Sequence, residues 1–206
     1  MAYSAWLVPS KTSGSGNDTV NVTAGADNTG RNARSTNMTF KAANCEDVVR
    51  TVMQSGKPEF VNIQSTAAVD KTGGTLTISG TTNSSKLTFS IGSSPTLTLT
   101  LPSSYTANSA QTDNGAAITG DPGAAQEFAF SITFTGIAVN TTVNTKSAQV
   151  IVTDNAGHTA TCTVTQAAGD ATLSVSPASV TLDWNAYTEG TSASFSVTSN
   201  TNWSIE

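Results

Sequence analysis

Short runs of alternating apolar and polar residues recur along the whole chain, and no long stretch repeats with the period of an α-helix. Leu97, Leu99 and Leu101 alternate with threonines, and residues 128–134 alternate in the same way. Such alternation is typical of strands that bury one face in a core. Proline and glycine separate many of the runs, as they do at the turns of a β-sandwich. The sequence therefore predicts an all-β protein made of β-sandwich domains.

The runs group into three units, which indicate tandem immunoglobulin-like β-sandwich domains. The first unit covers 1–58 and the second covers 59–169. Each of these two units closes on a Thr-Val-x-Gln sequence, at Thr51–Gln54 and at Thr163–Gln166. The third unit covers 170–206. We expect the first and third units to be partial domains, namely the second half and the first half of one kind of module.

A half sandwich cannot bury its apolar face alone, so we expect the partial units to be completed by contacts. The C-terminal strands of one copy could dock on the N-terminal half of a neighbour, or the two ends of one chain could meet. The alternative is a chain that continues past Glu206 and completes its own last domain. Trp6 and Trp203 occupy short stretches of the same kind, and we expect both in a core. The apolar residues that we expect to carry the assembly are Leu173, Val175, Phe195, Val197 and Trp203.

Charge and targeting signals narrow the choice of partners. Nine Lys and Arg residues against fourteen Asp and Glu residues give the chain a formal net charge of −5. A nucleic-acid binder needs clustered cations, and the nearest approach is Arg31 and Arg34, which we interpret as a local structural pair. The first residues lack the features of a cleaved leader, and no run could span a membrane. We expect neither nucleic acid nor membrane as a partner, although a mature secreted fragment would look the same.

The side chains that could do chemistry are few and scattered. His158 is the one residue on which a Ser-His-acid triad could be built, and no nucleophile motif accompanies it. Cys45 and Cys162 fall in different units, and we expect two unpaired, partly buried thiols, as suits a reducing cytoplasm. Zinc needs more ligands of this kind, and the turns at Asp113 and Asp154 need no calcium to explain them. We expect no enzyme, no cofactor and no metal site.

Exposed aromatic rings are the usual means of holding sugar rings. The candidates here are Trp184 and Tyr187, in the loop 183–189, and Tyr105, in the loop 102–110. A role for Trp184 at a domain junction explains that residue equally well. We name these three as the candidate glycan-binding residues.

Two groups of residues carry a family resemblance. The first is Leu173–Pro177 followed by Phe195–Ser204, and the second comprises Trp6–Pro9, Gly14–Gly16, Val20–Val22, Asn28, Arg31 or Arg34, and Thr51–Gln54. Both groups resemble the BACON family, which comprises immunoglobulin-like β-sandwich modules named for Bacteroidetes-associated carbohydrate binding. The first group is similar to the first half of such a module, and the second group is similar to the second half. The resemblance covers the two ends of the chain well and the middle poorly.

The resemblance and the composition together favour a non-enzymatic structural or adhesion protein of a bacteriophage particle. We expect it on the virion, as a capsid decoration or a head-fibre or tail component, made in the cytoplasm of the host bacterium. The expected partners are other virion proteins, further copies of the chain, and surface or mucin glycans. The alternative is a carbohydrate-binding module of a secreted polysaccharide-utilisation protein.

Overall fold

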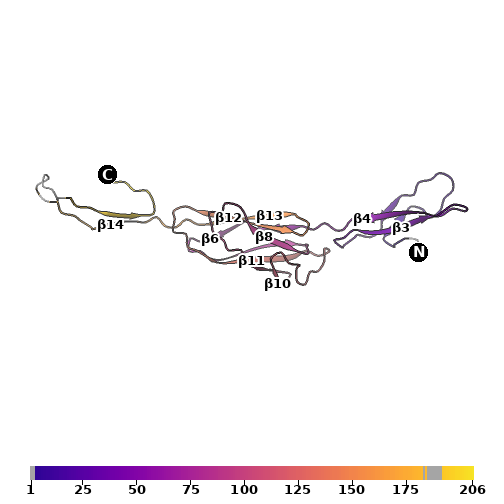
Figure 1. Ribbon diagram of the computed structural model, residues 1–206, viewed down its shortest axis with the longest axis horizontal. Helices are drawn as coiled ribbons and strands as arrows, with labels where there is room; N and C mark the ends of the chain where they lie inside the picture. Colours follow the sequence, from indigo (N-terminus) through magenta and orange to yellow (C-terminus); the bar gives the residue numbers. More distant parts are fainter. Residues whose placement is uncertain (1–2, 183, 185–191) are drawn as a thin grey trace.

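The computed structural model describes residues 3–182, 184 and 192–206, and these residues form fifteen strands. Figure 1 shows an elongated molecule in which a larger sandwich lies between two smaller units, with the termini at opposite ends of the long axis. No helix in the described ranges is long and apolar enough to cross a membrane. The prediction of an all-β, sandwich-based fold is confirmed.

The larger sandwich, called the middle domain here, consists of two sheets. The five-stranded sheet has the order β10-β9-β11-β7-β5, and the four-stranded sheet has the order β6-β13-β12-β8. Neighbouring strands are antiparallel except β6 and β13, which pair in parallel. The strands are β5 (Val61–Ile63), β6 (Thr66–Val69), β7 (Gly74–Thr82), β8 (Leu87–Ile91), β9 (Ser104–Ala107), β10 (Ala110–Asp113), β11 (Phe128–Ile137), β12 (Lys146–Asp154) and β13 (Thr159–Gln166).

The core of the middle domain lies between these two sheets. The alternating apolar residues of β11 and β12 point into it, because successive side chains of a strand face opposite sides. The ring of Phe89, on β8, contacts those of Tyr105 and Phe130 from the opposite sheet, with centroids 5.0 and 5.7 Å apart. These contacts across the sandwich hold the two sheets together.

One strand expected from the alternation does not form. Leu97 and Leu99 are buried as the pattern indicates, but the segment 96–101 belongs to no strand of the structure. The amides of Thr96 and Leu97 both donate to the carbonyl of Ser147 at 2.9 Å. Prolines stand on both sides of the segment and supply no backbone donor, which limits a regular ladder there.

The two end units hold only two-stranded sheets within the described residues. In the N-terminal unit β1 (Leu7–Pro9) pairs with β2 (Val22–Ala24), and β3 (Arg34–Phe40) pairs with β4 (Val48–Gln54). In the C-terminal unit β14 (Leu173–Ser176) pairs with β15 (Ser196–Ser199). Isolated two-stranded sheets have little core of their own, so these units leave apolar side chains uncovered.

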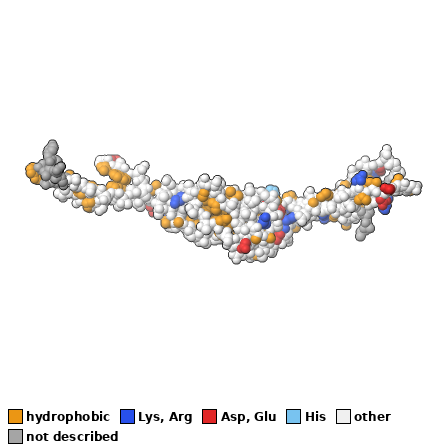
Figure 2. Space-filling model, in the orientation of Figure 1, with side chains coloured by type: hydrophobic (Ala, Val, Ile, Leu, Met, Phe, Trp, Pro, Cys, Tyr) orange, Lys and Arg blue, Asp and Glu red, His pale blue; other side chains and the backbone are white. Residues whose placement is uncertain are grey.

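Exposed apolar side chains concentrate on the end units. Among the described residues, 13 of the 14 large hydrophobic side chains that are exposed lie there, and Val139 is the one in the middle domain. Figure 2 shows hydrophobic side chains at the surface of both end units. Trp203 is 49% exposed, so the expectation that it lies in a core is wrong for this conformation. Trp6 is half-buried, under the guanidinium of Arg34 at 4.8 Å from its ring centroid.

Candidate functional site

The N-terminal unit repeats the second half of the middle domain at a constant offset along the chain. The side-chain amide of Asn28 donates to the carbonyls of Asn32 and Ser55. Asn140 makes the equivalent two bonds, to the carbonyls of Asn144 and Ala167. The strands follow the same offset, because residue 34 pairs with residue 54 in one hairpin as residue 146 pairs with residue 166 in the other. The β3-β4 hairpin is therefore the counterpart of β12-β13.

A glutamine closes each of these hairpins. The Nε2 group of Gln166 donates to the carbonyl of Ala138 at 2.8 Å, and that of Gln54 donates to the carbonyl of Ala26 at 3.1 Å. Gln166 has a second, longer bond of 3.4 Å to the carbonyl of Asp70, which directly follows β6. In the described N-terminal unit β4 pairs with β3 alone, so the counterpart of β6 is missing beside it.

The C-terminal unit repeats the first half of the middle domain. Asn83, which is buried, donates to the carbonyl of Pro58 and accepts the amide of Phe60. Asn200 does the same with the carbonyl of Asp170 and the amide of Thr172, at 2.8 Å in both cases. The equivalent hydrogen bonds make β14 the counterpart of β5, and β15 the counterpart of the end of β7.

Positions that the middle domain buries are open in the end units. Ile78 is fully buried, and its counterpart Phe195 is 50% exposed. Val61 is 7% exposed, whereas its counterpart Leu173 is 60% exposed. In the N-terminal unit, Phe40 occupies the position of a fully buried valine of β12 and is 42% exposed. The end units are thus two open half-sandwiches, called the N-terminal half (residues 3–57) and the C-terminal half (the described residues from 170 onward).

The candidate assembly residues all lie on or beside the β14-β15 sheet. Leu173, Val175 and Phe195 are at least half exposed, and Val197 is half-buried. The register of the sheet sets Val175 opposite Val197. The structure therefore brings three of the five together in one small sheet, with Phe195 directly before β15 and Trp203 after it in the chain.

The candidate glycan-binding residues do not form one site in the structure. Tyr105 lies in β9 with its ring in the core, only 3% exposed, so its assignment to an exposed loop is wrong. Burial raises the pKa of Tyr105 to about 12. Trp184 is 92% exposed. Tyr187 lies outside the described residues.

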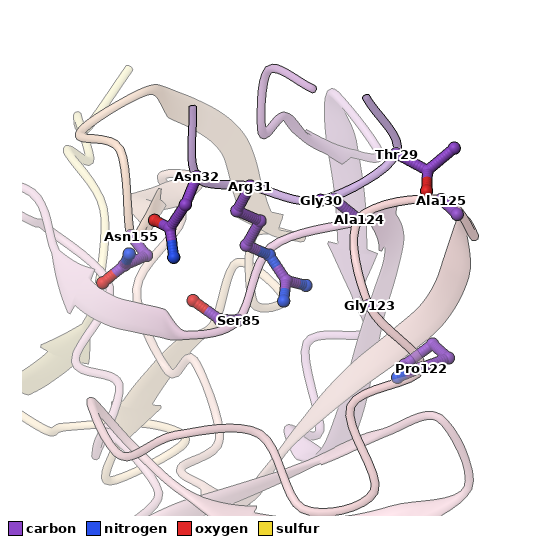
Figure 3. A pocket seen from close by; sticks show the side chains of 10 residues that line it. All are labelled: Thr29, Gly30, Arg31, Asn32, Ser85, Pro122, Gly123, Ala124, Ala125 and Asn155. Carbon is purple, nitrogen blue, oxygen red and sulfur yellow. The ribbon is translucent and has the colours of Figure 1, made fainter. Parts of the chain in front are cut away.

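Arg31 holds the N-terminal half against the middle domain. We call its contacts with Asp121, Asn83 and Glu59 the clamp, and the place where the two units meet the first junction. The guanidinium of Arg31 donates two hydrogen bonds to the carboxylate of Asp121, at 2.6 and 2.8 Å, and a third to the carbonyl of Asn83. Its Nε lies 2.7 Å from a carboxylate oxygen of Glu59, which is buried. The pairing of Arg31 with Arg34 expected from the sequence is thus replaced by contacts across the junction. In Figure 3 Arg31 points into the cleft between Ser85 and Pro122.

The contacts between Arg31 and Asp121 shift the pKa values of these two side chains toward the charged forms. Hydrogen bonding to Asp121 raises the pKa of Arg31. Partial burial works against ionisation of Asp121, but hydrogen bonds from Arg31 and from the amide of Gly123 outweigh it and lower the pKa. The linker that follows β4 packs tightly here, because a side chain at Gly56 would collide with the carbonyl of Arg31. The junction is therefore held by charge-assisted bonds and close backbone packing.

The remaining candidates for chemistry have structural partners. The Nδ1 atom of His158 lies 2.8 Å from a carboxylate oxygen of Asp154 in the β12-β13 hairpin. The side chain of Asn114 accepts a hydrogen bond from the backbone amide of Phe89 and donates one to the backbone carbonyl of Phe89. Cys45 is an exposed thiol, contrary to the expected partial burial, because it lies in the β3-β4 turn. Cys162 is a free and buried thiol, and its burial raises its pKa.

The comparisons with known proteins bear on the N-terminal half. Residues 2–55 match the BACON family model. That family is described as a putative binding domain, N-terminal, and the match ends one residue after Gln54 closes β4. The resemblance to BACON modules is thereby confirmed for this part of the chain, which is about a quarter of its length. No curated protein matches the chain.

We expect Arg31→Met to loosen the first junction. The variant removes the three hydrogen bonds that the guanidinium donates and leaves Glu59 buried without its cation, which costs about 2 kcal/mol. That loss corresponds to roughly a 30-fold rise in the opening equilibrium. The measurement is the rate of limited proteolysis by subtilisin in the linker at residues 55–58.

The matched control is Arg50→Met, since Arg50 is exposed and bonds only to the neighbouring carbonyl of Val49 in the described structure. In the unsubstituted chain, ionised Asp121 stabilises the junction. This stabilisation is fully present above the ordinary pKa of 3.8 and is lost as the pH falls through the lower pKa that Asp121 has in the folded protein. Equal cleavage rates for the two variants at pH 7 would contradict the role of the clamp.

Proposed function

We propose that this chain is a non-enzymatic structural and adhesion protein that assembles through its sandwich units on a bacteriophage particle. The observation that carries the proposal is the pair of open half-sandwiches at the two ends of an elongated molecule. Contiguous exposed apolar surface marks interaction sites in stable proteins. Such ends suit a capsid decoration, a head fibre or a tail component, which must join other subunits.

The energetics support assembly through these ends. Complete burial of a Val, Leu or Phe side chain contributes about 1.5–3 kcal/mol. Leu173, Leu182 and Phe195 are each at least half exposed, so each has about 1 kcal/mol still to gain. The N-terminal half has a similar number of uncovered side chains, including Val22 and Phe40. Contacts that cover both halves therefore have a substantial driving force.

The match of residues 2–55 to a putative binding domain also favours a binding role. The ion pairs of the described residues lie within hairpins or between neighbouring units. His158 pairs with Asp154 in the β12-β13 hairpin, and Lys71 of the middle domain pairs with Asp170 of the C-terminal half. We propose a place on the virion, with other virion proteins, further copies and surface or mucin glycans as partners. Nucleic acid and membranes are not among the proposed partners, since the chain carries few cations and a net charge of −5.

An antibody raised against the purified chain tests the proposed location. It should label the surface of intact phage particles in negative-stain electron microscopy, because an elongated decoration or fibre stands out from the capsid. Particles of an unrelated phage are the control. Label found only in the particle-free culture medium would contradict the proposal and favour a secreted protein.

A second candidate function is carbohydrate binding by a secreted polysaccharide-utilisation protein. One observation favours it, namely the 92% exposure of Trp184. An exposed indole ring offers a flat apolar face with a polar edge, which suits stacking against a sugar ring.

For this second candidate, Trp184→Ala should weaken retention on immobilised gastric mucin about tenfold, which corresponds to about 1.4 kcal/mol of binding free energy. The matched control is Val139→Ala, which shortens the exposed apolar side chain of the middle domain. Affinity electrophoresis in mucin-containing gels measures the retention. Identical mobility of the two variants in these gels would rule out a role for Trp184 in glycan retention.

A further inference from the structure

We infer that the segment 178–182 of one chain adds as a parallel strand to β4 of a second copy, with Val180 opposite Val52 and Leu182 opposite Gln54. The inference rests on the assembly function proposed above and specifies its partner and its register. It joins the C-terminal half of one copy to the N-terminal half of the next.

The middle domain supplies the template for this contact. There β6 pairs in parallel with β13, and the register sets Val164 opposite Ala67 and Gln166 opposite Val69. The strand β4 carries the same Thr-Val-x-Gln sequence as β13, at the equivalent positions of its own hairpin. β4 pairs with β3 on one side only in the described structure. Its other edge therefore presents unpaired backbone groups in the arrangement that accepts β6 in the middle domain.

The segment 178–182 corresponds to β6. Both follow the first strand of their unit, because β14 is the counterpart of β5. In β6 the inward side chains alternate, with Ala67 partly buried and Val69 6% exposed. Val180 and Leu182 alternate in the same way one position further along, yet Leu182 is 63% exposed. The segment has the pattern of an inward-facing strand and belongs to no strand of its own unit.

Gln54 favours the same register. Its counterpart Gln166 bonds to carbonyls on both of its sides, one after β11 and one after β6. Gln54 has the first of these bonds, through the carbonyl of Ala26. In the inferred register Gln54 stands opposite Leu182, as Gln166 stands opposite Val69 in the middle domain. The incoming strand therefore lies on the side of Gln54 that corresponds to the second bond of Gln166.

A second copy is the occupant that the internal repeat specifies. The N-terminal half holds counterparts of β12 and β13, and the C-terminal half holds counterparts of β5 and β7, so each supplies strands that the other lacks. Within one molecule the two halves lie at opposite ends, with the middle domain between them (Figure 1). They therefore meet between molecules. Because the two surfaces differ, the contact is head-to-tail, and each added copy presents an open half to the next.

Disulfide trapping tests this register. One chain carries Met53→Cys and the other carries Thr181→Cys, and both carry Cys45→Ser, so that the buried Cys162 is the one thiol they share. Met53 and Thr181 are expected to be opposite each other on the outer face, as Thr165 and Ala68 are in the middle domain. Tags of different length separate mixed dimers from self-dimers on non-reducing gels. We expect a mixed disulfide to form under oxidised glutathione.

The matched control moves one cysteine along the same strand. Ser179→Cys replaces Thr181→Cys, which keeps the outward face and shifts the thiol by about 6.6 Å. A disulfide needs Cα atoms about 4.4–6.8 Å apart, so we expect roughly tenfold slower trapping with this control. Equal or faster trapping at Ser179 would overturn the register and leave the assembly function standing. A chain that traps at neither position and stays monomeric at every concentration would overturn both.

A charge on the inward face tests the packing separately. Leu182→Asp, added to the Thr181→Cys chain, should abolish trapping because it places a carboxylate against the apolar face of the N-terminal half. Ala178→Asp should leave trapping unchanged, because Ala178 is exposed and the residue at the equivalent position of the middle domain, Ser65, is exposed as well. Leu182 is exposed in the single chain, so the variant leaves the fold of each copy intact. Undiminished trapping with Leu182→Asp would overturn the inferred packing.

Discussion

The middle domain depends on a contact between two strands that lie near its opposite ends in the sequence. β6 pairs in parallel with β13, and this pairing joins the first half of the sandwich to the second. Gln166, the buried last residue of β13, donates to the carbonyl of Asp70 after β6 and to the carbonyl of Ala138 after β11. The same two half-sandwiches recur at the ends of the chain, separated by the whole middle domain. In the described residues of a single copy many of their large apolar side chains are exposed.

In the middle domain the two halves cover each other within one folded unit. At the ends of the chain the same kind of contact is available for binding a partner. In the middle domain, Ile78 and Val69 are buried by the other half of the same unit. Their counterparts Phe195 and Leu182 are exposed, although the local hydrogen bonds of Asn200 match those of Asn83. Each half therefore has the local structure of a sandwich without its core. A protein with such ends gains stability when it joins a partner, which suits a structural or adhesive role.

The sequence predicted the parts of the fold that local pattern controls. The alternating run 128–134 identified β11, and the Thr-Val-x-Gln repeat identified the closing strands β4 and β13. Short strands such as β5, β6, β9 and β10 were missed because tertiary pairing rather than local pattern determines them. Tyr105 was placed in a loop for the same reason. The clamp was missed because Arg31 and Asp121 are 90 residues apart in the chain. The one sequence signal for the architecture that the end units share with the middle domain is the constant offset between equivalent asparagines and glutamines.

The central claim is that the two ends of the molecule complete each other between copies. Light scattering behind size exclusion, over a concentration series of the full chain, tests it most directly. The account predicts an average mass that rises with concentration from the 21.0 kDa of one chain through successive multiples, because each head-to-tail contact leaves an open half for a further copy. A constant mass of one chain across the whole series would contradict it.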